Sequence, residues 1–341
     1  MKLSLVELST VAPGDDKARA LKDSIDAAKQ AESLGYHRIW YAEHHDSAST
    51  ASTAPEILIA LAADATSRIR VGSGAVLLNH YSPYKVAESF LQLEALTPGR
   101  IDLGLGRATA GPVIDLALRR NRDVPPADDF AEQVQEVLAY FEGRFPADHP
   151  FARLNPAAGV ASRPDVWILG SSGSSARMAG ELGLGYAFAG FINPDGASRA
   201  LLRHGAFSTP AANGPAGGRG ILSVSAVVAD TDAEARRLNW SRTALMARLA
   251  RQGAAAQVPT VEEAERELSQ EQKNIPTVIT DGRWPRQIAG SPQTVRDQLE
   301  QMTKATGVDE VMVQDIIADP ADRAHSRVLL AKALDIAPTA E

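Results

Sequence analysis

Short runs of alternating hydrophobic and polar residues are followed along the chain by longer runs with helical spacing. Residues 2–8 alternate and are rich in strand-forming residues, whereas residues 16–34 place apolar side chains at helical intervals until Gly35. This pattern predicts a strand followed by a helix.

The same unit recurs along the chain and predicts eight strands. Strict alternation of strands and helices indicates a parallel sheet with right-handed connections. The further predicted strands are 37–41, 69–78, 101–105, 166–169, 186–189, 221–228 and 308–313, and the further helices are 57–65, 84–96, 130–141, 174–182, 232–252 and 323–334.

The number of strands favours a closed barrel over an open, doubly wound sheet. An open sheet that binds a dinucleotide needs a Gly-x-Gly turn after its first strand, but residues 9–14 read STVAPG. We therefore predict an α/β fold, a single (β/α)8 TIM barrel over residues 1–337. Residues 108–128, 143–163 and 262–291 break the alternation and are predicted as loop insertions over the C-terminal face.

Composition narrows the function classes. The 341 residues are 44% hydrophobic and 23% charged, with a net charge of -7, which is typical of a globular protein and gives no basic stripe for nucleic acid. The chain contains no cysteine, which excludes disulfides and thiolate metal sites. No apolar stretch approaches a membrane span, and the first residues do not resemble a signal peptide, so we expect a cytoplasmic enzyme.

Ionisable residues follow the second predicted strand, where a barrel carries its working residues. Glu43, His44 and His45 are consecutive, and a histidine titrates near neutral pH and can transfer a proton. Metal binding is the weaker interpretation because neighbouring residues on an extended chain point apart. A purely structural role for one of these residues stays open.

Small residues follow the third strand, and an arginine follows the fourth. Residues 72–75, which include Gly74 and Ala75, would let a flat ligand lie against the backbone or would fit a tight barrel interior. Arg107 carries a fork of donors that suits a phosphate, although an exposed or ion-paired arginine is the alternative.

Serines follow the fifth strand and precede a predicted helix. Ser171, Ser172 and Ser175 lie where helix amides attract an anion, although serine is also a common helix cap. Together with Arg107 these residues favour a phosphate site. Apolar residues near the barrel mouth, such as Phe188, Phe191 and Ile192, would permit a hydrophobic ligand.

Four segments together resemble the bacterial luciferase-like flavin-dependent monooxygenase family, and most closely its single-component, luciferase alpha-like branch. The segments are 35–45 (GYHRIWYAEHH), 70–107 (with VGSGAVLLNHYSP and PGRIDLGLGR), 166–175 and 289–313. Their order and spacing along a barrel carry the resemblance.

The resemblance implies roles for individual residues. His44 corresponds to the catalytic histidine near the flavin, and Gly74-Ala75 to a non-proline cis peptide under its ring. Arg107, Ser172 and Ser175 match phosphate-contacting positions, with Ser171 beside them. Glu43, His45, His80 and Phe191 are expected to contact substrate or to support the site. Gly106 replaces the reactive cysteine of true luciferases, which weighs against light emission.

The resemblance also implies a reaction and partners. Reduced FMN from a separate reductase would react with O2 to give a peroxyflavin that oxygenates a small organic substrate. A homodimer and a mobile lid around residues 273–285 are implied as well. The alternatives are an F420-dependent oxidoreductase, a non-catalytic flavin-binding protein and a metal-dependent hydrolase, although we predict no metal.

Overall fold

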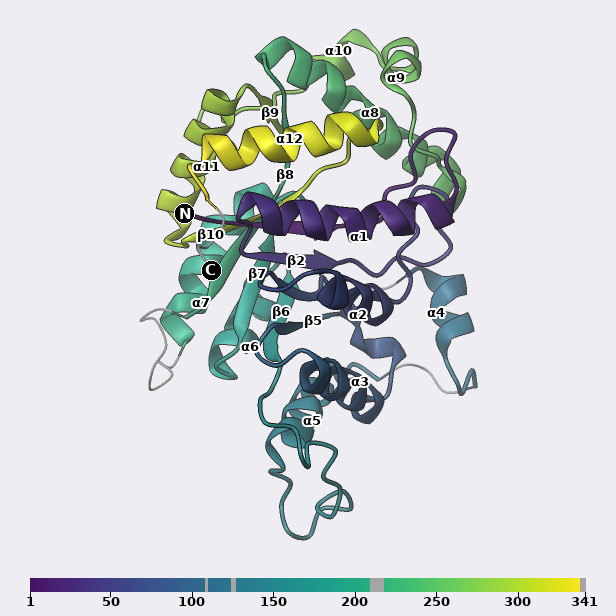
Figure 1. Cartoon of the computed structure of the whole chain (residues 1–341), viewed down its shortest axis with the longest axis vertical. Helices are drawn as coiled ribbons and strands as arrows, with labels where there is room; N and C mark the ends of the chain where they lie inside the picture. Colours follow the sequence, from purple (N-terminus) through teal and green to yellow (C-terminus); the bar gives the residue numbers. More distant parts are fainter. Residues whose placement is uncertain (108–109, 124–126, 209–217, 338–341) are drawn as a thin grey trace.

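Eight parallel strands close into a barrel in the computed structural model, which describes residues 1–107, 110–123, 127–208 and 218–337 (Figure 1). The order is β10-β1-β2-β3-β5-β6-β7-β8, and a β8–β10 pairing closes the ring. This confirms the predicted (β/α)8 barrel. The strands are β1 (Lys2–Glu7), β2 (Arg38–Tyr41), β3 (Arg70–Ser73), β5 (Ile101–Gly106), β6 (Asp165–Gly170), β7 (Gly185–Ala189), β8 (Gly220–Val228) and β10 (Glu310–Gln314).

Eight helices surround the strands, and none of the helices within the described ranges is long and apolar enough to cross a membrane. Local signals fix their ends: the Asp16 carboxylate accepts from Arg19 N at the start of the first, and Gly35 ends it with φ of 86°. They are α1 (Lys17–Leu34), α2 (Pro55–Ala65), α3 (Pro83–Leu96), α5 (Phe130–Glu142), α6 (Gly173–Glu181), α7 (Ala197–Phe207), α11 (Pro292–Thr306) and α12 (Pro320–Ala333). Helices α7 and α11 were not among those predicted.

The predicted helix over 232–252 forms α8 (Asp232–Gln252), but it does not complete the surrounding ring of helices. That position belongs to α11, which packs between α7 and α12. Helix α8 instead lies on the C-terminal face: Leu245 packs with Leu8 and Ile316, which follow β1 and β10. After α8, Ala254 O accepts a hydrogen bond from Ala48 N in the loop beyond β2 (2.8 Å).

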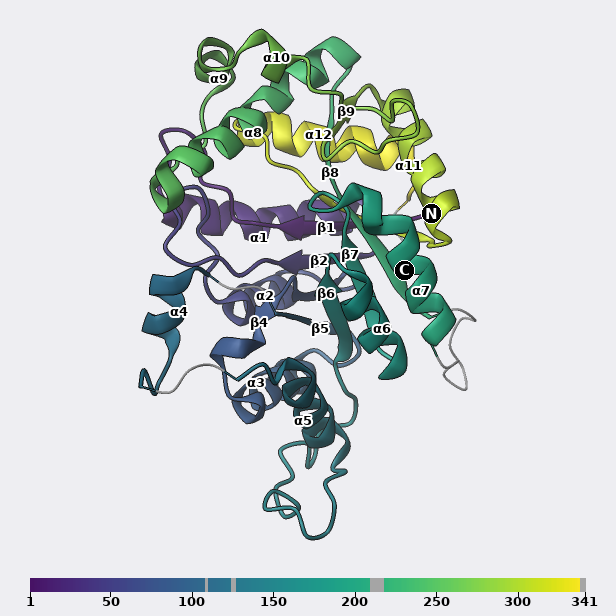
Figure 2. The ribbon, with the colours of Figure 1, turned by 180° about the vertical axis from the view of Figure 1, so that it is seen from behind.

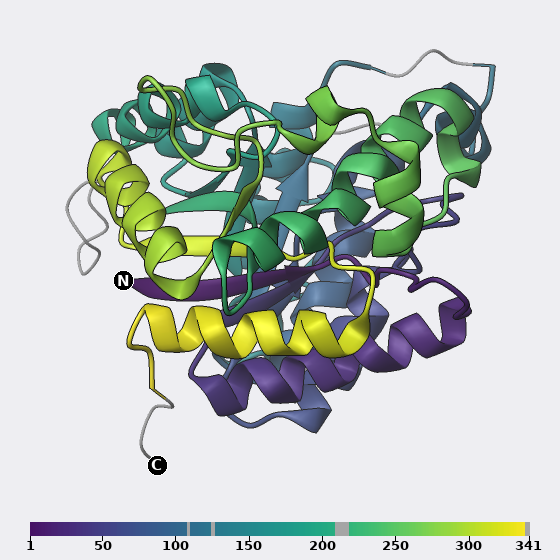
Figure 3. The same cartoon turned by 90° about the horizontal axis from the view of Figure 1, so that it is seen from above.

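The third insertion is therefore longer than predicted, since it includes α8. It continues through η3 (Gly253–Ala255), α9 (Val261–Glu267) and α10 (Gln270–Lys273) to β9 (Ile288–Gly290), which extends the sheet along β8. Figure 3 shows this green segment extending toward the end of the barrel opposite to the two termini.

The other two insertions lie at opposite ends of the barrel. The first follows β5 at the C-terminal face and contains α4 (Pro112–Leu118), although its residues 108–109 and 124–126 lie outside the described part. Residues 143–163 were wrongly predicted over that face: they join α5 to β6, and a loop from a helix to the next strand lies at the N-terminal end. Figures 1 and 2 show them projecting beyond α5.

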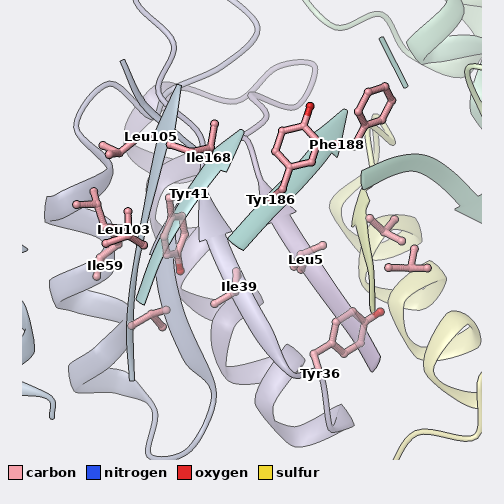
Figure 4. Packing of buried hydrophobic residues seen from close by; sticks show 14 of the residues in the cluster. Leu5, Tyr36, Ile39, Tyr41, Ile59, Leu103, Leu105, Ile168, Tyr186 and Phe188 are labelled. Carbon is pink, nitrogen blue, oxygen red and sulfur yellow. The ribbon is translucent and has the colours of Figure 1, made fainter. Parts of the chain in front are cut away.

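Outward-facing strand residues pack against the surrounding helices (Figure 4). Phe188 belongs to this layer and is fully buried, so its predicted contact with a ligand at the mouth is wrong. Alternation places every second residue of β7 outside the barrel, which accounts for its burial. The labelled members of the layer are Leu5, Tyr36, Ile39, Tyr41, Ile59, Leu103, Leu105, Ile168, Tyr186 and Phe188.

Two tryptophans fill the barrel interior. Trp40 and Trp167 meet edge to face, with ring centroids 5.5 Å apart. Glycines on neighbouring strands make room: a Cβ on Gly72 would lie 2.9 Å from Trp40 Cδ1, and one on Gly185 would lie 2.3 Å from Trp167 Cε3. Gly72 is therefore required by the tight packing of the barrel interior.

A buried ion cluster lies below the tryptophans, at the N-terminal end of the strands. Arg38 Nη1 donates to Asp102 Oδ2 and Arg38 Nε donates to Glu310 Oε1, both at 2.7 Å. Asp102 also accepts from Arg70 Nη2 (2.6 Å) and from Trp40 Nε1 (2.9 Å). Burial alone would raise the pKa of Asp102, but Arg38 and Arg70 outweigh it and hold that pKa below its ordinary value.

Replacing Arg38 tests whether this cluster holds the barrel together. Arg38→Met leaves buried carboxylates without their cation, so we expect the free energy of unfolding to fall by about 3–5 kcal/mol. Chemical denaturation followed by circular dichroism measures this change. The matched control is Arg19→Met: its side chain is largely exposed beside Asp23, and its loss should cost less than about 1 kcal/mol. Equal losses in the two variants would contradict the assignment.

Candidate functional site

The candidate residues lie at the C-terminal ends of four neighbouring strand segments. Tyr41 pairs with Ser73, Leu77 with Gly106, and Gly106 with Leu169. Three steps separate β2 from β6, which at about 4.8 Å a step gives about 14 Å along the curved sheet. This arrangement brings the predicted histidine, cis-peptide, arginine and serine segments together in one row.

Glu43 joins two of these segments through its buried carboxylate. Oε1 accepts from Tyr81 Oη (2.7 Å) and lies 2.7 Å from His45 Nε2, and Oε2 accepts from Leu77 N (3.0 Å). Glu43 and His45 thus hold the loop after β2 against the segment after β3. Tyr81 was missed by the sequence reasoning, because a tyrosine 38 residues away gives no local signal.

His44 lies between these two supporting residues in the chain and, unlike them, is exposed. Its backbone N donates to Ser52 O (2.9 Å), and its ring makes no hydrogen bond within the described ranges. Desolvation by the surrounding protein disfavours the charged ring and lowers the pKa of His44 below 6.5. The neighbouring His45 also lowers this pKa, whereas the Glu43 carboxylate raises it. The imidazole is therefore neutral at pH 7 and can accept a proton.

The strand predicted over 69–78 is interrupted by a cis peptide bond between Gly74 and Ala75, as the resemblance implied. It divides into β3, β4 (Val76–Leu77) and η1 (Leu78–His80). Gly74 N donates to Tyr41 O (2.7 Å), which fixes this segment beside β2. A Cβ on Gly106 would lie 3.1 Å from Ala75 Cβ, so the glycine on β5 lets the two segments approach closely.

Arg107 lies directly after β5 and is held loosely. Its Nη1 lies 3.3 Å from Asp128 Oδ1, and both side chains are mostly exposed, at 65% and 88%. An exposed pair of this kind contributes little to stability, so the guanidinium is available to an anionic ligand.

The serines surround the exposed start of α6. Ser172 is the N-cap: its Oγ accepts from Ser175 N (3.3 Å), so the capping role is real. Tyr186 Oη lies 3.0 Å from Ser175 Oγ and donates to Ser172 O (2.9 Å). Ser171 O accepts from Asn193 Nδ2 (2.9 Å), which ties this turn to the loop after β7. Hydroxyls and helix amides together can hold a phosphate.

A cation that sequence reasoning did not find lies beside this turn. Arg203 on α7 places Nη1 3.5 Å from the position of a Cβ on Gly173, the first residue of α6. No helix was predicted over 197–207, so the sequence did not place Arg203 near the start of α6.

His80 and Phe191 take different positions in the row. The buried His80 ring places Nε2 3.4 Å from Asp115 Oδ1, so it contacts the α4 segment rather than the Glu43 carboxylate. Phe191 is half-buried in the loop after β7. Within the ranges that the structure describes, no group of three or more His, Asp or Glu side chains is arranged to hold a metal ion.

Comparison with known proteins identifies the family. The family model of luciferase-like monooxygenases matches residues 1–310. The chain belongs to the luciferase-like monooxygenase family. One relative, the N-acetyl-S-alkylcysteine monooxygenase of Bacillus subtilis (strain 168), is 40% identical over 193 residues, which are 57% of this chain and 58% of that protein.

Solved structures of similar proteins share the barrel. Apo-MsnO8 is 40% identical and superposes with a TM-score of 0.88 over 99% of both chains. The oxygenating constituent of 3,6-diketocamphane monooxygenase from the CAM plasmid of Pseudomonas putida, solved in complex with FMN, is 24% identical with a TM-score of 0.69 over 100% of this chain and 99% of that one. At that identity the second comparison shows the shared fold alone.

Proposed function

We propose that this luciferase-like monooxygenase uses reduced FMN and O2 to oxygenate a small organic substrate. The row of residues from His44 to the α6 N-terminus is the observation that carries the proposal. It combines a proton acceptor, a closely packed backbone segment and an anion site across about 14 Å, which suits an extended ligand with a phosphate at one end.

The donor set fits FMN. The exposed amides of α6, with Ser171, Ser172 and Ser175 around them, suit the phosphate, and Arg107 lies on the adjacent strand end. Gly74, Ala75 and Gly106 carry no large side chains, so a flat ring can lie against the backbone of this segment. FMN, when bound in its reduced form, supplies the electrons that activate O2.

Residues of the chain orient the ligand and accept the proton. His44 holds a neutral ring nitrogen that accepts a proton during the reaction, and Glu43 and His45 fix the loop that carries it. The insertion from α8 to β9 covers the C-terminal face and excludes water, with residues 273–285 acting as a lid. Phe191 lines the apolar side of the substrate site.

The same proposal includes partners. A separate reductase supplies reduced FMN in the cytoplasm, and two copies of the chain form a homodimer. An apolar groove of about 340 Å³ between α1 and α2 supports the dimer, since Ile57 and Leu61 on it are 60% and 52% exposed.

Cofactor and product measurements test the proposed function directly. Absorbance titration should show saturable binding of FMN and none of F420, because the start of α6 suits the terminal phosphate monoester of FMN, whereas the phosphate of F420 is a diester that carries a lactyl-glutamate tail. Purified protein with reduced FMN, 18O2 and a panel of aldehydes, alkanes, sulfonates and an N-acetyl-S-alkylcysteine should yield a product that carries one 18O atom. Binding of F420 alone indicates the hydride-transfer alternative, and FMN binding without any product indicates a non-catalytic flavoprotein.

His44→Ala should lower the oxygenation rate by roughly 10²- to 10⁴-fold with the fold intact, the usual range for a positioned proton-transfer group. Because only the neutral ring accepts a proton and its pKa lies below 6.5, wild-type kcat/KM should fall on the acid side below that pH. The pH profile of the variant should lack this acid-side decrease in kcat/KM. His325→Ala, an exposed histidine on α12, is the control. A variant with wild-type turnover would remove His44 from the mechanism.

Arg107→Ala should weaken the binding of FMN by roughly ten- to hundredfold and that of riboflavin by much less, because only FMN carries the phosphate. Flavin fluorescence titration measures both affinities. Arg144→Ala, in the exposed segment at the other end of the barrel, should change neither. Equal losses for the two flavins would refute the phosphate assignment.

A further inference from the structure

A buried arginine on α8 has no counter-ion in the described part of the chain. Arg242 is 5% exposed, its Nε is buried without a hydrogen-bond partner, and neither Nη atom donates to a described residue. Burial, together with the nearby charge of Arg286, lowers the pKa of Arg242 to about 10. No carboxylate offsets either effect among the described residues.

The Arg38 cluster shows what a structural arginine looks like in this protein. Arg38 is buried to the same degree, but Asp102 and Glu310 occupy its donors at 2.7 Å. A buried charge without such partners is unfavourable and persists where a ligand supplies the missing charge. Arg242 therefore differs from Arg38 because its donors have no partner among the described residues and are available to a ligand.

A second cation lies beside Arg242. Arg286 is exposed in the segment before β9, and the next residue, Gln287, accepts from Thr243 Oγ1 through Oε1 (3.3 Å). This contact fixes the segment that carries Arg286 against α8. The buried Asn239, one turn before Thr243, also leaves Oδ1 without a partner in the described ranges.

Both arginines lie on the C-terminal face, at the same end of the barrel as His44. Leu238 packs with Ile317, which follows β10, and with Val227 on β8, while Leu245 packs with Leu8 beyond β1. Arg242 lies between Leu238 and Leu245 on the helix and so on the side turned to the barrel. Helix α8 then continues to the loop that carries Ala48, four residues after His44.

We propose that Arg242 and Arg286 bind an oxyanionic group, a carboxylate or sulfonate, of the organic substrate. This rests on the proposed monooxygenase function, which it deepens by naming the substrate class. The arginine fork matches the paired oxygens of such a group, and the uncharged remainder of the substrate extends toward His44. The insertion thus supplies the charge that selects the substrate, while the row from His44 to α6 holds the cofactor.

Calorimetry with probes of equal chain length tests the proposal on the full chain, without flavin. The probes are hexanoate, hexanesulfonate, the neutral 1-hexanol and inorganic phosphate. We expect at least one organic anion to bind roughly ten- to hundredfold more tightly than 1-hexanol, the range for hydrogen bonds to charged groups. Arg242→Met should abolish this preference, Arg242→Lys should restore part of it, and Arg286→Gln should reduce it. The control Arg236→Met, an exposed arginine on the same helix, should retain it.

Thermal unfolding separates a binding role from a structural one. In buffer without oxyanions, Arg242→Met should raise the Tm because it removes an uncompensated buried charge. Hexanoate or hexanesulfonate should raise the Tm of the wild type and leave that of the variant unchanged. A variant that unfolds at lower temperature regardless of added anion would assign Arg242 to the fold and overturn the proposal.

Three other outcomes also overturn it. The first is equal binding of 1-hexanol and both organic anions, and the second is binding of inorganic phosphate as tight as that of the organic anions. The third is a loss of FMN affinity in Arg242→Met with riboflavin affinity unchanged, which would place the cofactor phosphate there. Because the probes need no flavin, a chain that prefers organic anions but binds no FMN would refute the proposed function and leave the oxyanion site standing.

Discussion

The buried contact of Arg38 with Asp102 and Glu310 connects three strands that are far apart in the sequence, and the rest of the barrel is arranged around it. Asp102 also holds Trp40 Nε1, and the Arg38 guanidinium lies 4.7 Å from the Trp167 ring centroid. Ion cluster and indoles together fill the N-terminal half of the interior. The interior is therefore filled, and a catalytic site can form only at the C-terminal ends of the strands, where the loops determine which residues line it.

At the C-terminal end, the Glu43 carboxylate connects two segments of the site, as Arg38 connects strands of the barrel. Glu43 accepts hydrogen bonds from Tyr81 and Leu77 and contacts His45, so the loop after β2 and the segment after the cis peptide move as one unit. Because His44 lies between Glu43 and His45 in the chain, its backbone is fixed on both sides while its ring stays accessible. A pre-organised proton acceptor needs this combination of a rigid backbone and a free ring.

The regular strands could be predicted because alternation and helical spacing are local properties, and the serine and arginine positions followed from where strands end. Other features depended on long-range contacts. Both 232–252 and 292–306 have the composition of helices, and only packing decides that α11 joins the ring while α8 lies on the C-terminal face. The interior role of Gly72 depends on Trp40 from another strand. Arg242 gave no signal, since an arginine in a polar helix usually faces solvent.

The contrast between the two ends of the barrel gives these charges a common explanation. At the N-terminal end, acidic partners compensate Arg38 and Arg70, and the charges stabilise the fold. At the C-terminal end, Glu7 and Asp315 likewise compensate the buried Arg327, but Arg107 is loosely paired and Arg242 has no acidic partner among the described residues. A buried positive charge without a partner costs stability, so we attribute the positions of Arg242 and Arg107 to ligands that bring the negative charge with them. One anion, at Arg107 and α6, would belong to the cofactor, and the other, at Arg242, to the substrate.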